Sequence, residues 1–451
     1  MVRYATARAA VIEATELTAP CLTVDLDVAD PIPDIAGSSP SEEVRCMWAL
    51  VRMQTEPVGI LMMAVPPEGV RRHQLVDGLT QVFGPELRAR SEAVGANWPR
   101  VDGDAPIETA RPSIFLTSRQ DVLSHGLPFT VVVCTREQPR GLERCLASLV
   151  RQSYPCFSIL VVDNAPTTDC SQSVVARLRA GALPIDYVVE PRPGLAWARN
   201  RAIQTVREGI LAWIDDDEVA DEFWLAELAR GFVEHSGVDA VSGIMLPAEL
   251  RTSAQVWFEQ YGGHHKHRGF DSITFSPRAG LRQSPLYPLP PFGTGGNMAF
   301  RREALVQLGG FDTALGAGTL SKGAEDTRAF TDLLLDGGTV VYQPTAVTHH
   351  FHRETRAELR RQMFGYGAGL TAYYTSLLLS RPGCARELIG LVPTFVRDMA
   401  GPASLRTGQL PSGFPSELRW ANRWGMASGP FRYLGARIVA RQEGRRRRRA
   451  G

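Results

Sequence analysis

The sequence predicts an α/β fold with a mostly parallel central sheet, preceded by a small N-terminal α+β domain and followed by a helical C-terminal region. Between residues 129 and 217, four short apolar runs alternate with helical segments, which is typical of βαβ units and a parallel sheet. A hairpin pattern comes before them, and helical periodicity follows. We therefore divide the chain into residues 1–125, 126–355 and 356–451.

The N-terminal part has the pattern of a small domain of unknown role. Two apolar runs in "CMWALVRMQTEPVGILMMAV" (46–65) flank "QTEP", which is typical of a β-hairpin. A helical pattern follows at 71–83, and 94–113 has the Gly, Pro and Asp content of a linker. No group of candidate catalytic residues occurs here, so we expect a structural or partner-docking domain.

The middle part carries polar residues where its predicted strands end. The strands are expected at 129–135, 158–164, 185–191 and 209–217, and the helices at 141–152, 170–181 and 194–208. Ligands of such sheets bind beyond the carboxyl ends of the strands. Thr135, Arg136, Asp163, Asn164 and the acids of "IDDDE" (214–218) are therefore expected on one rim.

The C-terminal part shows helical patterns at 356–379, 385–401 and 430–444, the last of them amphipathic and basic. Five consecutive arginines, Arg445–Arg449, follow it. A basic residue near an anionic membrane contributes about 1 kcal/mol to binding. Attachment to such a surface and a plain disordered tail both stay open.

Composition excludes several classes of protein. The formal net charge of +1 offers no general attraction for nucleic acid, and seven cysteines without a CxxC pair indicate reduced thiols. No apolar run reaches the ~18–20 residues of a membrane span. The N-terminus also lacks the apolar centre of a secretory signal. We expect a cytoplasmic protein, soluble or peripherally attached to the inner face of the cell membrane.

Four consecutive acids, Asp215, Asp216, Asp217 and Glu218, close the fourth predicted strand. Adjacent carboxylates repel one another, and burial at a strand end would desolvate them as well. A divalent cation such as Mg²⁺ or Mn²⁺ would offset this repulsion and bind substrate phosphate oxygens. The alternative is a solvated acidic loop that caps the helix expected from residue 221, because acids favour a helix N-terminus.

Three later segments extend this pattern. They are a Gly-rich loop in "FGTGGNMAFRREAL" (292–305), an acidic pair in "GAEDTRAF" (323–330) and histidines in "VVYQPTAVTHHFHR" (340–353). Together with "VVVCTR", "VVDN", "PGLAWARN" and "DDD", this order resembles glycosyltransferase family 2, which has the Rossmann-like GT-A fold. The resemblance covers residues 128–370 and leaves the N-terminal part and the far C-terminus outside.

The resemblance implies a binding site for a nucleoside-diphosphate sugar. Thr135 and Arg136 would line the nucleotide pocket, and Asp163 would hydrogen-bond the base. The other residues that it assigns to the donor site are Arg199, Asn200, Asp215, Asp216, Gly295, Gly296 and Asn297. The two glycines would let a loop pass close beneath donor and acceptor.

The resemblance also implies a metal site and a catalytic base. The metal, Mn²⁺ or Mg²⁺, would be held by Asp217, Asp215 and His350. His352 could share the strand face of His350, whereas His349 alternates to the other face. Asp326 matches the family's base, which takes the proton of the acceptor hydroxyl, and Glu325 would support it. Stabilisation of the helix N-terminus is the simpler role for this pair.

The expected activity is metal-dependent, inverting transfer of a sugar to a hydroxyl of a glycan, a lipid-linked acceptor or a small molecule. Two other functions stay open: a sugar-phosphate nucleotidyltransferase, and a non-catalytic sugar- or partner-binding protein on the same scaffold. The first expects a basic Gly-rich phosphate loop after the first strand, which "CTREQPRGLERCL" (134–146) does not provide. The second would tolerate loss of the acids, and all of them are present.

Overall fold

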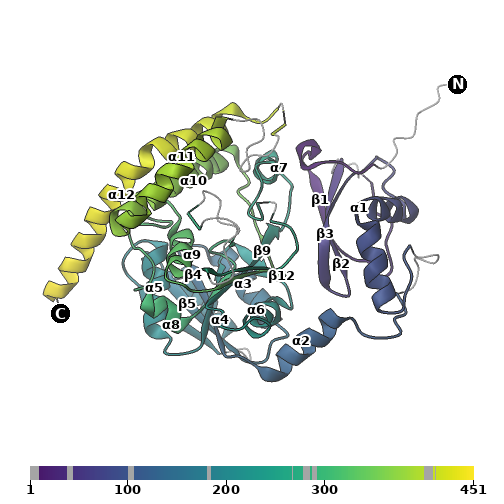
Figure 1. The fold of residues 1–451 in the computed structure, drawn as a ribbon, viewed down its shortest axis with the longest axis horizontal. Coiled ribbons are helices and arrows are strands. Elements are labelled where there is room, and N and C mark those ends of the chain that lie inside the picture. The colour runs from purple at the N-terminus through teal and green to yellow at the C-terminus, as the bar shows by residue number, and fades with distance from the viewer. Residues whose placement is uncertain are drawn as a thin grey trace.

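The computed structural model describes residues 10–37, 44–99, 106–179, 184–266, 268–277, 285–286, 292–400, 410–411 and 413–450. A nine-stranded sheet lies at the centre, with helices on both faces. A three-stranded sheet with its own helix lies on one side, and long C-terminal helices cross the opposite side (Figure 1). The predicted α/β fold with a helical C-terminal region is confirmed.

The parallel half of the large sheet consists of βαβ units, as the sequence predicts. Its strands, in the spatial order β7-β4-β5-β6, are β4 (Phe129–Thr135), β5 (Phe157–Asn164), β6 (Ile185–Glu190) and β7 (Ile210–Asp215). The helices between them are α3 (Pro139–Val150), α4 (Cys170–Leu178) and α5 (Leu195–Thr205). The register pairs Thr135 with Asp163 and Cys134 with Asp215, so the polar residues do end on one rim.

The other half contains antiparallel pairings, which the sequence did not reveal. β11 (Met298–Arg301) runs antiparallel between β7 and β9 (Ala240–Pro247), and β12 (Val340–His350) lies parallel to β9. β8 (Glu218–Ala220) and β10 (Ile273–Phe275) pair antiparallel with β12. The β8 pairing sets Glu218 opposite His350. The acidic run and the histidine strand therefore meet.

Residues 10–99 hold a short 3₁₀ helix, η1 (Ala14–Glu16), and a sheet covered by α1 (Arg72–Ala93). The predicted hairpin is β2 (Cys46–Met53) and β3 (Glu56–Ala64), and an unpredicted strand, β1 (Cys21–Asp27), runs parallel to β2. One face of β2 packs on α1. The other, with Trp48 and Leu50, packs on the β9–β12 edge of the large sheet.

The helix α2 (Ile114–His125) connects this part to the large sheet. Its Arg119 donates to buried Glu227 at 2.7 Å and to Thr55 of the hairpin turn at 2.7 Å. Arg230 lies 2.8 Å from the other oxygen of Glu227. Through Arg119, the helix α2 therefore links the hairpin of the N-terminal sheet to α6 of the core. The domain boundary at residue 125 stays a prediction.

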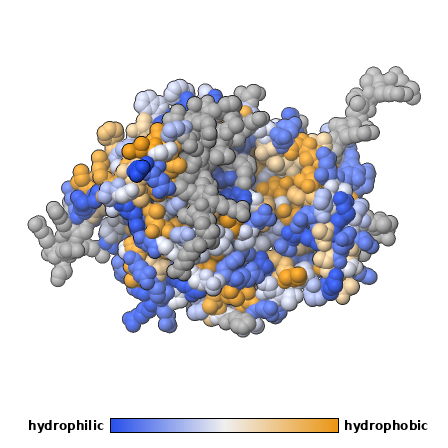
Figure 2. Space-filling model, in the orientation of Figure 1, coloured by the Kyte–Doolittle hydropathy of each residue, from blue (hydrophilic) through white to orange (hydrophobic). Residues whose placement is uncertain are grey.

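The C-terminal helices are α10 (Arg356–Ser380), the short η3 (Pro382–Cys384), α11 (Ala385–Ala400) and α12 (Ser416–Ala450). A β-carbon at Gly367 of α10 would lie 2.0 Å from the Asn422 carbonyl oxygen of α12, so glycine permits their close packing. Figure 2 shows apolar surface over these helices. The side chains of Arg445–Arg449 lie outside the described residues. Within the described ranges, no helix combines the length and hydropathy that a bilayer crossing requires.

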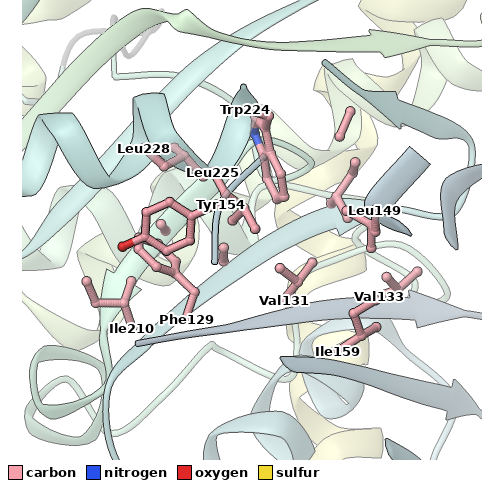
Figure 3. Close-up of a cluster of buried hydrophobic side chains, with 14 of the residues drawn as sticks. Phe129, Val131, Val133, Leu149, Tyr154, Ile159, Ile210, Trp224, Leu225 and Leu228 are labelled. Atoms are coloured by element: carbon pink, nitrogen blue, oxygen red, sulfur yellow. The ribbon is translucent and has the colours of Figure 1, made fainter. Parts of the chain in front are cut away.

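Two apolar cores cover the two faces of the large sheet, because side chains alternate along each strand. Val131 and Val133 of β4 face a core with α3, α4 and α6 (Trp224–Val233). Val132 and Cys134 face a core with α5, α8 (Arg302–Gln307) and α9 (Glu325–Leu335). Figure 3 shows the first core, with α6 side chains over β4. Packing on both faces holds the polar strand ends in place.

Candidate functional site

The four acids after β7 have four different environments. Asp216 points toward β4, where the Thr135 hydroxyl donates to its Oδ2 at 2.6 Å. Burial, and then the charge of Asp217, raises the pKa of Asp216 to about 7. At the start of α6, the Asp221 carboxylate accepts a hydrogen bond from the Phe223 N–H at 3.0 Å. Helix capping therefore does not account for the acidic run.

Asp217 lies opposite the end of β12. Its Oδ2 is 3.5 Å from His350 Nε2 and 3.2 Å from the guanidinium of Arg353. Burial works to raise the pKa of Asp217, but His350 and then Arg353 hold it below its ordinary value. With its side chain 24% exposed, this carboxylate is ionised and accessible, as a metal ligand must be.

Glu218 is enclosed beside them. Its carboxylate oxygens have no hydrogen-bond partner of good geometry among the described residues, and the residue is 1% exposed. Burial, and then the charge of Asp215, raises its pKa well above the ordinary value. A buried carboxyl in such a place is tolerated when it holds a proton or when a cation lies near.

Arg199 is the positive counterpart of this acidic group. Its buried guanidinium donates to Glu325 Oε1 at 2.8 Å and to the Gly295 carbonyl oxygen at 2.9 Å. It also lies 3.7 Å from Asp215 Oδ1. Arg199 therefore joins α5, the Gly-rich loop and α9 to the end of β7.

The Gly-rich loop passes directly against the acids. A β-carbon at Gly295 would lie 2.9 Å from Asp326 Oδ2. One at Gly296 would lie 1.8 Å from Glu218 Oε1 and 2.8 Å from Asp215 Oδ2. At Gly295 the Arg199 guanidinium nitrogens are equally near, at 2.8 and 2.9 Å, so a side chain at either glycine would crowd the charged groups of the site. The place of this loop beneath donor and acceptor stays a prediction.

The two acids that begin α9 differ in accessibility: Glu325 is buried in an ion pair, and Asp326 is partly exposed. Glu325 is buried against Arg199, and burial raises its pKa to about 7 even though Arg199 favours the charged form. Asp326 is partly exposed, and its Oδ1 accepts the Thr327 N–H at 2.7 Å. Its Oδ2 lies beside the Gly-rich loop. Asp326 is thus the member of the pair that a ligand can reach.

Thr135, Arg136 and Asp163 lie on the rim beyond β4 and β5. Asp163 Oδ2 accepts the Tyr187 hydroxyl at 2.8 Å, whereas its Oδ1 has no partner of good geometry in the described part of the chain. Burial raises the pKa of Asp163, and the Tyr187 hydrogen bond opposes this shift. Arg136 is exposed at the end of β4. On this rim Arg136 is therefore exposed to a ligand, whereas Asp163 is buried, and its contact with a base stays a prediction.

The two asparagines expected at the donor site have protein partners. Asn200 donates to the Phe311 carbonyl oxygen at 2.8 Å and accepts its N–H at 2.7 Å. Buried Asn297 donates to the carbonyl oxygens of Ile244 and Ala346, each at 2.8 Å, and accepts the Trp224 indole N–H at 2.9 Å. Both asparagines hold the loops around the site. Their direct contact with a donor stays a prediction.

A cluster of histidines lies behind His350, and the sequence analysis found part of it. The nitrogen atoms of His264, His350 and His352 lie within 4.8 Å of one another. Glu259, on α7 (Ser253–Gln260), accepts from His352 Nε2 at 2.8 Å. Glu259 and His264 were missed because they lie far from the other site residues in the chain. The histidine-rich "GGHHKH" (262–267) was the available signal.

Part of this chain is similar to known glycosyltransferases. The model of glycosyl transferase family 2 matches residues 130–309. Succinoglycan biosynthesis protein ExoM of Rhizobium meliloti is 29% identical over 241 residues, 52% of this chain and 70% of that protein. Glucosyl-dolichyl phosphate glucuronosyltransferase of Haloferax volcanii is 22% identical over 241 residues, 51% of this chain and 71% of that protein.

Among solved structures, the mannosyltransferase of Pyrobaculum calidifontis in complex with GDP-Man and Mn²⁺ is similar at a TM-score of 0.42 and 19% identity. That alignment covers 73% of this chain and 82% of the mannosyltransferase. The family match includes the acids after β7 and the Gly-rich loop, whereas Glu325, Asp326 and His350 lie beyond it.

We expect Asn297→Ala to destabilise the protein. The change leaves two buried carbonyl oxygens and a buried indole N–H without their partner, and each such loss costs about 1–3 kcal/mol. Thermal unfolding followed by circular dichroism should show a midpoint lower by several degrees. Asn97→Ala, at an exposed position, is the control that should unfold like the parent. An unchanged midpoint for Asn297→Ala would contradict the structural role.

Proposed function

We propose that this chain, whose residues 130–309 match the model of glycosyl transferase family 2, is a metal-dependent, inverting glycosyltransferase. It would move a sugar from a nucleoside-diphosphate sugar to an acceptor hydroxyl. The observation that carries the proposal is the meeting of Asp217 with His350, 3.5 Å apart, on the rim where the accessible carboxylate of Asp326 also lies. The match to a family of transferases favours this activity over nucleotidyl transfer or binding without catalysis.

Asp217, Asp215 and His350 are the residues that would hold the cation. Neighbouring ligands of an ion with bonds of about 2.1 Å lie about 3 Å apart, close to the 3.5 Å between Asp217 Oδ2 and His350 Nε2. Carboxylate oxygens suit both Mg²⁺ and Mn²⁺, and the imidazole favours Mn²⁺. When bound, the cation neutralises charge on the departing nucleoside diphosphate.

Asp326 is the base in this proposal, and the arrangement supports inversion. A single displacement inverts the anomeric centre and needs one carboxylate to take the proton of the attacking hydroxyl. A double displacement would need a second carboxylate free to form a covalent intermediate. Glu325 is buried and ion-paired with Arg199 at 2.8 Å, so it is not free for that role. It instead fixes the start of α9 and with it Asp326.

The nucleotide would lie over the ends of β4 and β5. Asp163 Oδ1, which has no partner of good geometry among the described residues, would accept an N–H of the base. Exposed Arg136 would contact the phosphates, and Thr135 would act through Asp216, which it holds at 2.6 Å. Arg199, Asn200 and Asn297 would contribute by holding the loops that surround the donor.

A lipid-linked acceptor at an anionic membrane surface is the acceptor class that we favour. The Haloferax relative is named for a dolichyl phosphate substrate. Moreover, α12 presents large apolar side chains to solvent on one face (Figure 2), at Trp420, Trp424, Phe431, Leu434 and Ile438. Arginines at 419, 423, 437 and 441 flank this face. Exposed aromatic rings beside basic residues suit the interface of an anionic bilayer.

The proposal extends to the location of the protein. The apolar and basic face of α12 supports a cytoplasmic location at the inner face of the cell membrane. The cytoplasmic leaflet carries the negative surface potential that attracts basic segments. All seven cysteines are free thiols, which suits a reducing compartment. The tail Arg445–Arg449 would add to the attraction.

Asp217→Asn should abolish metal-dependent binding of the donor. The amide keeps the shape of the carboxylate but removes the charge that holds the cation. Calorimetric titration with Mn²⁺ and a panel of nucleotide sugars should show binding by the parent chain and an affinity at least about tenfold lower for the variant. Asp186→Asn, at an exposed position on β6, should bind like the parent. Donor binding by the parent that does not depend on Mn²⁺ or Mg²⁺ would refute the metal site.

Asp326→Asn should stop transfer and leave donor binding intact. The amide cannot take a proton from the acceptor hydroxyl, and loss of a general base typically lowers the rate about 10²–10⁴-fold. Release of nucleoside diphosphate in the presence of acceptor measures transfer, and calorimetry measures donor binding. A variant with the parental transfer rate would remove Asp326 from the mechanism.

Replacing Trp424 and Phe431 together by serine should weaken membrane binding. Their side chains are 67% and 76% exposed on the apolar face of α12, so the change removes the groups that would enter the interface. Flotation with vesicles of phosphatidylcholine and phosphatidylglycerol should show a several-fold smaller bound fraction. Val150→Ser, an exposed apolar position far from α12, is the control. If deletion of residues 445–451 abolishes binding and the double variant does not, the tail alone is the membrane contact.

A further inference from the structure

Glu259, His352 and His350 form a buried chain that ends at the proposed cation site. Glu259 Oε1 lies 2.8 Å from His352 Nε2, His352 Nδ1 lies 2.8 Å from His350 Nδ1, and His350 Nε2 lies 3.5 Å from Asp217 Oδ2. The three residues are 2–4% exposed. Each contact in the chain therefore forms away from bulk water.

The positions of the hydrogens follow from the partners at the two ends of the chain. A carboxylate can only accept, so His352 Nε2 carries the hydrogen that faces Glu259. Burial disfavours a charged ring, so a neutral His352 has its lone pair at Nδ1. His350 Nδ1, 2.8 Å away, must then carry the hydrogen between the two rings. When His350 binds a cation, its remaining lone pair is therefore at Nε2, the nitrogen that faces Asp217.

The surroundings keep these rings from turning over. His265 Nε2 lies 3.1 Å from the second oxygen of Glu259. The ring of Phe258 packs edge-on against His352 at a centroid distance of 4.8 Å, and the ring of His264 lies 4.5 Å from that of His350. Rotation of either imidazole would break a buried hydrogen bond and these contacts at once.

We propose that Glu259 and His352 are positioning residues that hold His350 in the tautomer whose Nε2 lone pair faces Asp217. The proposal rests on the proposed function, since it gives His350 a cation to bind. Outer partners of this kind orient a histidine ligand and make it more basic, and their loss typically lowers metal affinity about 10–100-fold. Because imidazole distinguishes Mn²⁺ from Mg²⁺, the same chain sets the preference of the site for Mn²⁺.

A separate ion held by the three histidines is the competing arrangement. An ion there would compete with the hydrogen bonds that the ring nitrogens of His352 already make to His350 and Glu259. It would also take His350 away from Asp217 or make it bridge two ions. The hydrogen positions described above require neither of these changes. We therefore favour the chain of hydrogen bonds.

The test compares the affinities for Mn²⁺ and Mg²⁺ in the full-length protein. In His352→Phe the ring shape is kept but His350 Nδ1 loses its acceptor, and in Glu259→Gln the charge at the end of the chain is lost. Mn²⁺ binding is followed by electron paramagnetic resonance of the free ion, and Mg²⁺ by its competition. Glu249→Gln is the matched control, because Glu249 accepts from Gln255 at 3.1 Å and is outside the chain.

We expect the dissociation constant for Mn²⁺ to rise about 10–100-fold in His352→Phe and less in Glu259→Gln. The constant for Mg²⁺, which relies on oxygen ligands, should change much less, and the control should match the parent. Equal weakening of both ions, or unchanged Mn²⁺ affinity in both variants, would overturn the proposal. The proposal would also be overturned if the parent chain bound two Mn²⁺ ions and the His264→Ala variant bound only one. If the parent binds no Mn²⁺, the proposed function itself fails.

Discussion

Mutual repulsion among the four acids after β7 is the constraint on which the site depends. Three of the carboxylates lie beside different partners: Asp216 beside the Thr135 hydroxyl, Asp217 beside His350 and Arg353, and Asp215 beside Arg199. Glu218 is buried without a partner of good geometry among the described residues. The surrounding groups thus offset most of the repulsion, and the remaining negative potential lies where a cation would lower the energy further.

The strand directions bring the end of β12 to these acids. Because β11 is antiparallel to both β7 and β9, and β9 is parallel to β12, the strands β7 and β12 end on the same edge of the sheet. The β8–β12 pairing then sets Glu218 against His350, and the Phe351 N–H donates to the Asp217 carbonyl oxygen at 3.0 Å. The strand that carries the histidines is therefore bonded to the acidic run itself, so the positions of ligand groups from distant segments are mutually fixed.

Several residues at the site act on other residues rather than on a ligand. Arg199 joins the Gly-rich loop to Glu325, Asn200 and Asn297 hold backbone groups, and Glu259 holds His352. Buried polar groups of this kind must all be paired for the arrangement to be stable. Exposed Arg136 and partly exposed Asp326 are left for the ligands. The helix α12, packed on α10, turns an apolar and basic face outward.

The sequence by itself determined the βαβ order, the hairpin, the C-terminal helices and the rim that carries Thr135, Asp163 and the acids. These features depend on periodicity, turns and strand ends, which are local properties of the chain. Tertiary structure alone decided that β11 and β8 run antiparallel and that Asn297 bonds Trp224, 73 residues away. It also decided that Glu259 meets His352, 93 residues along the chain. A side chain's partner across such distances depends on how whole strands and helices pack, and no local pattern encodes that.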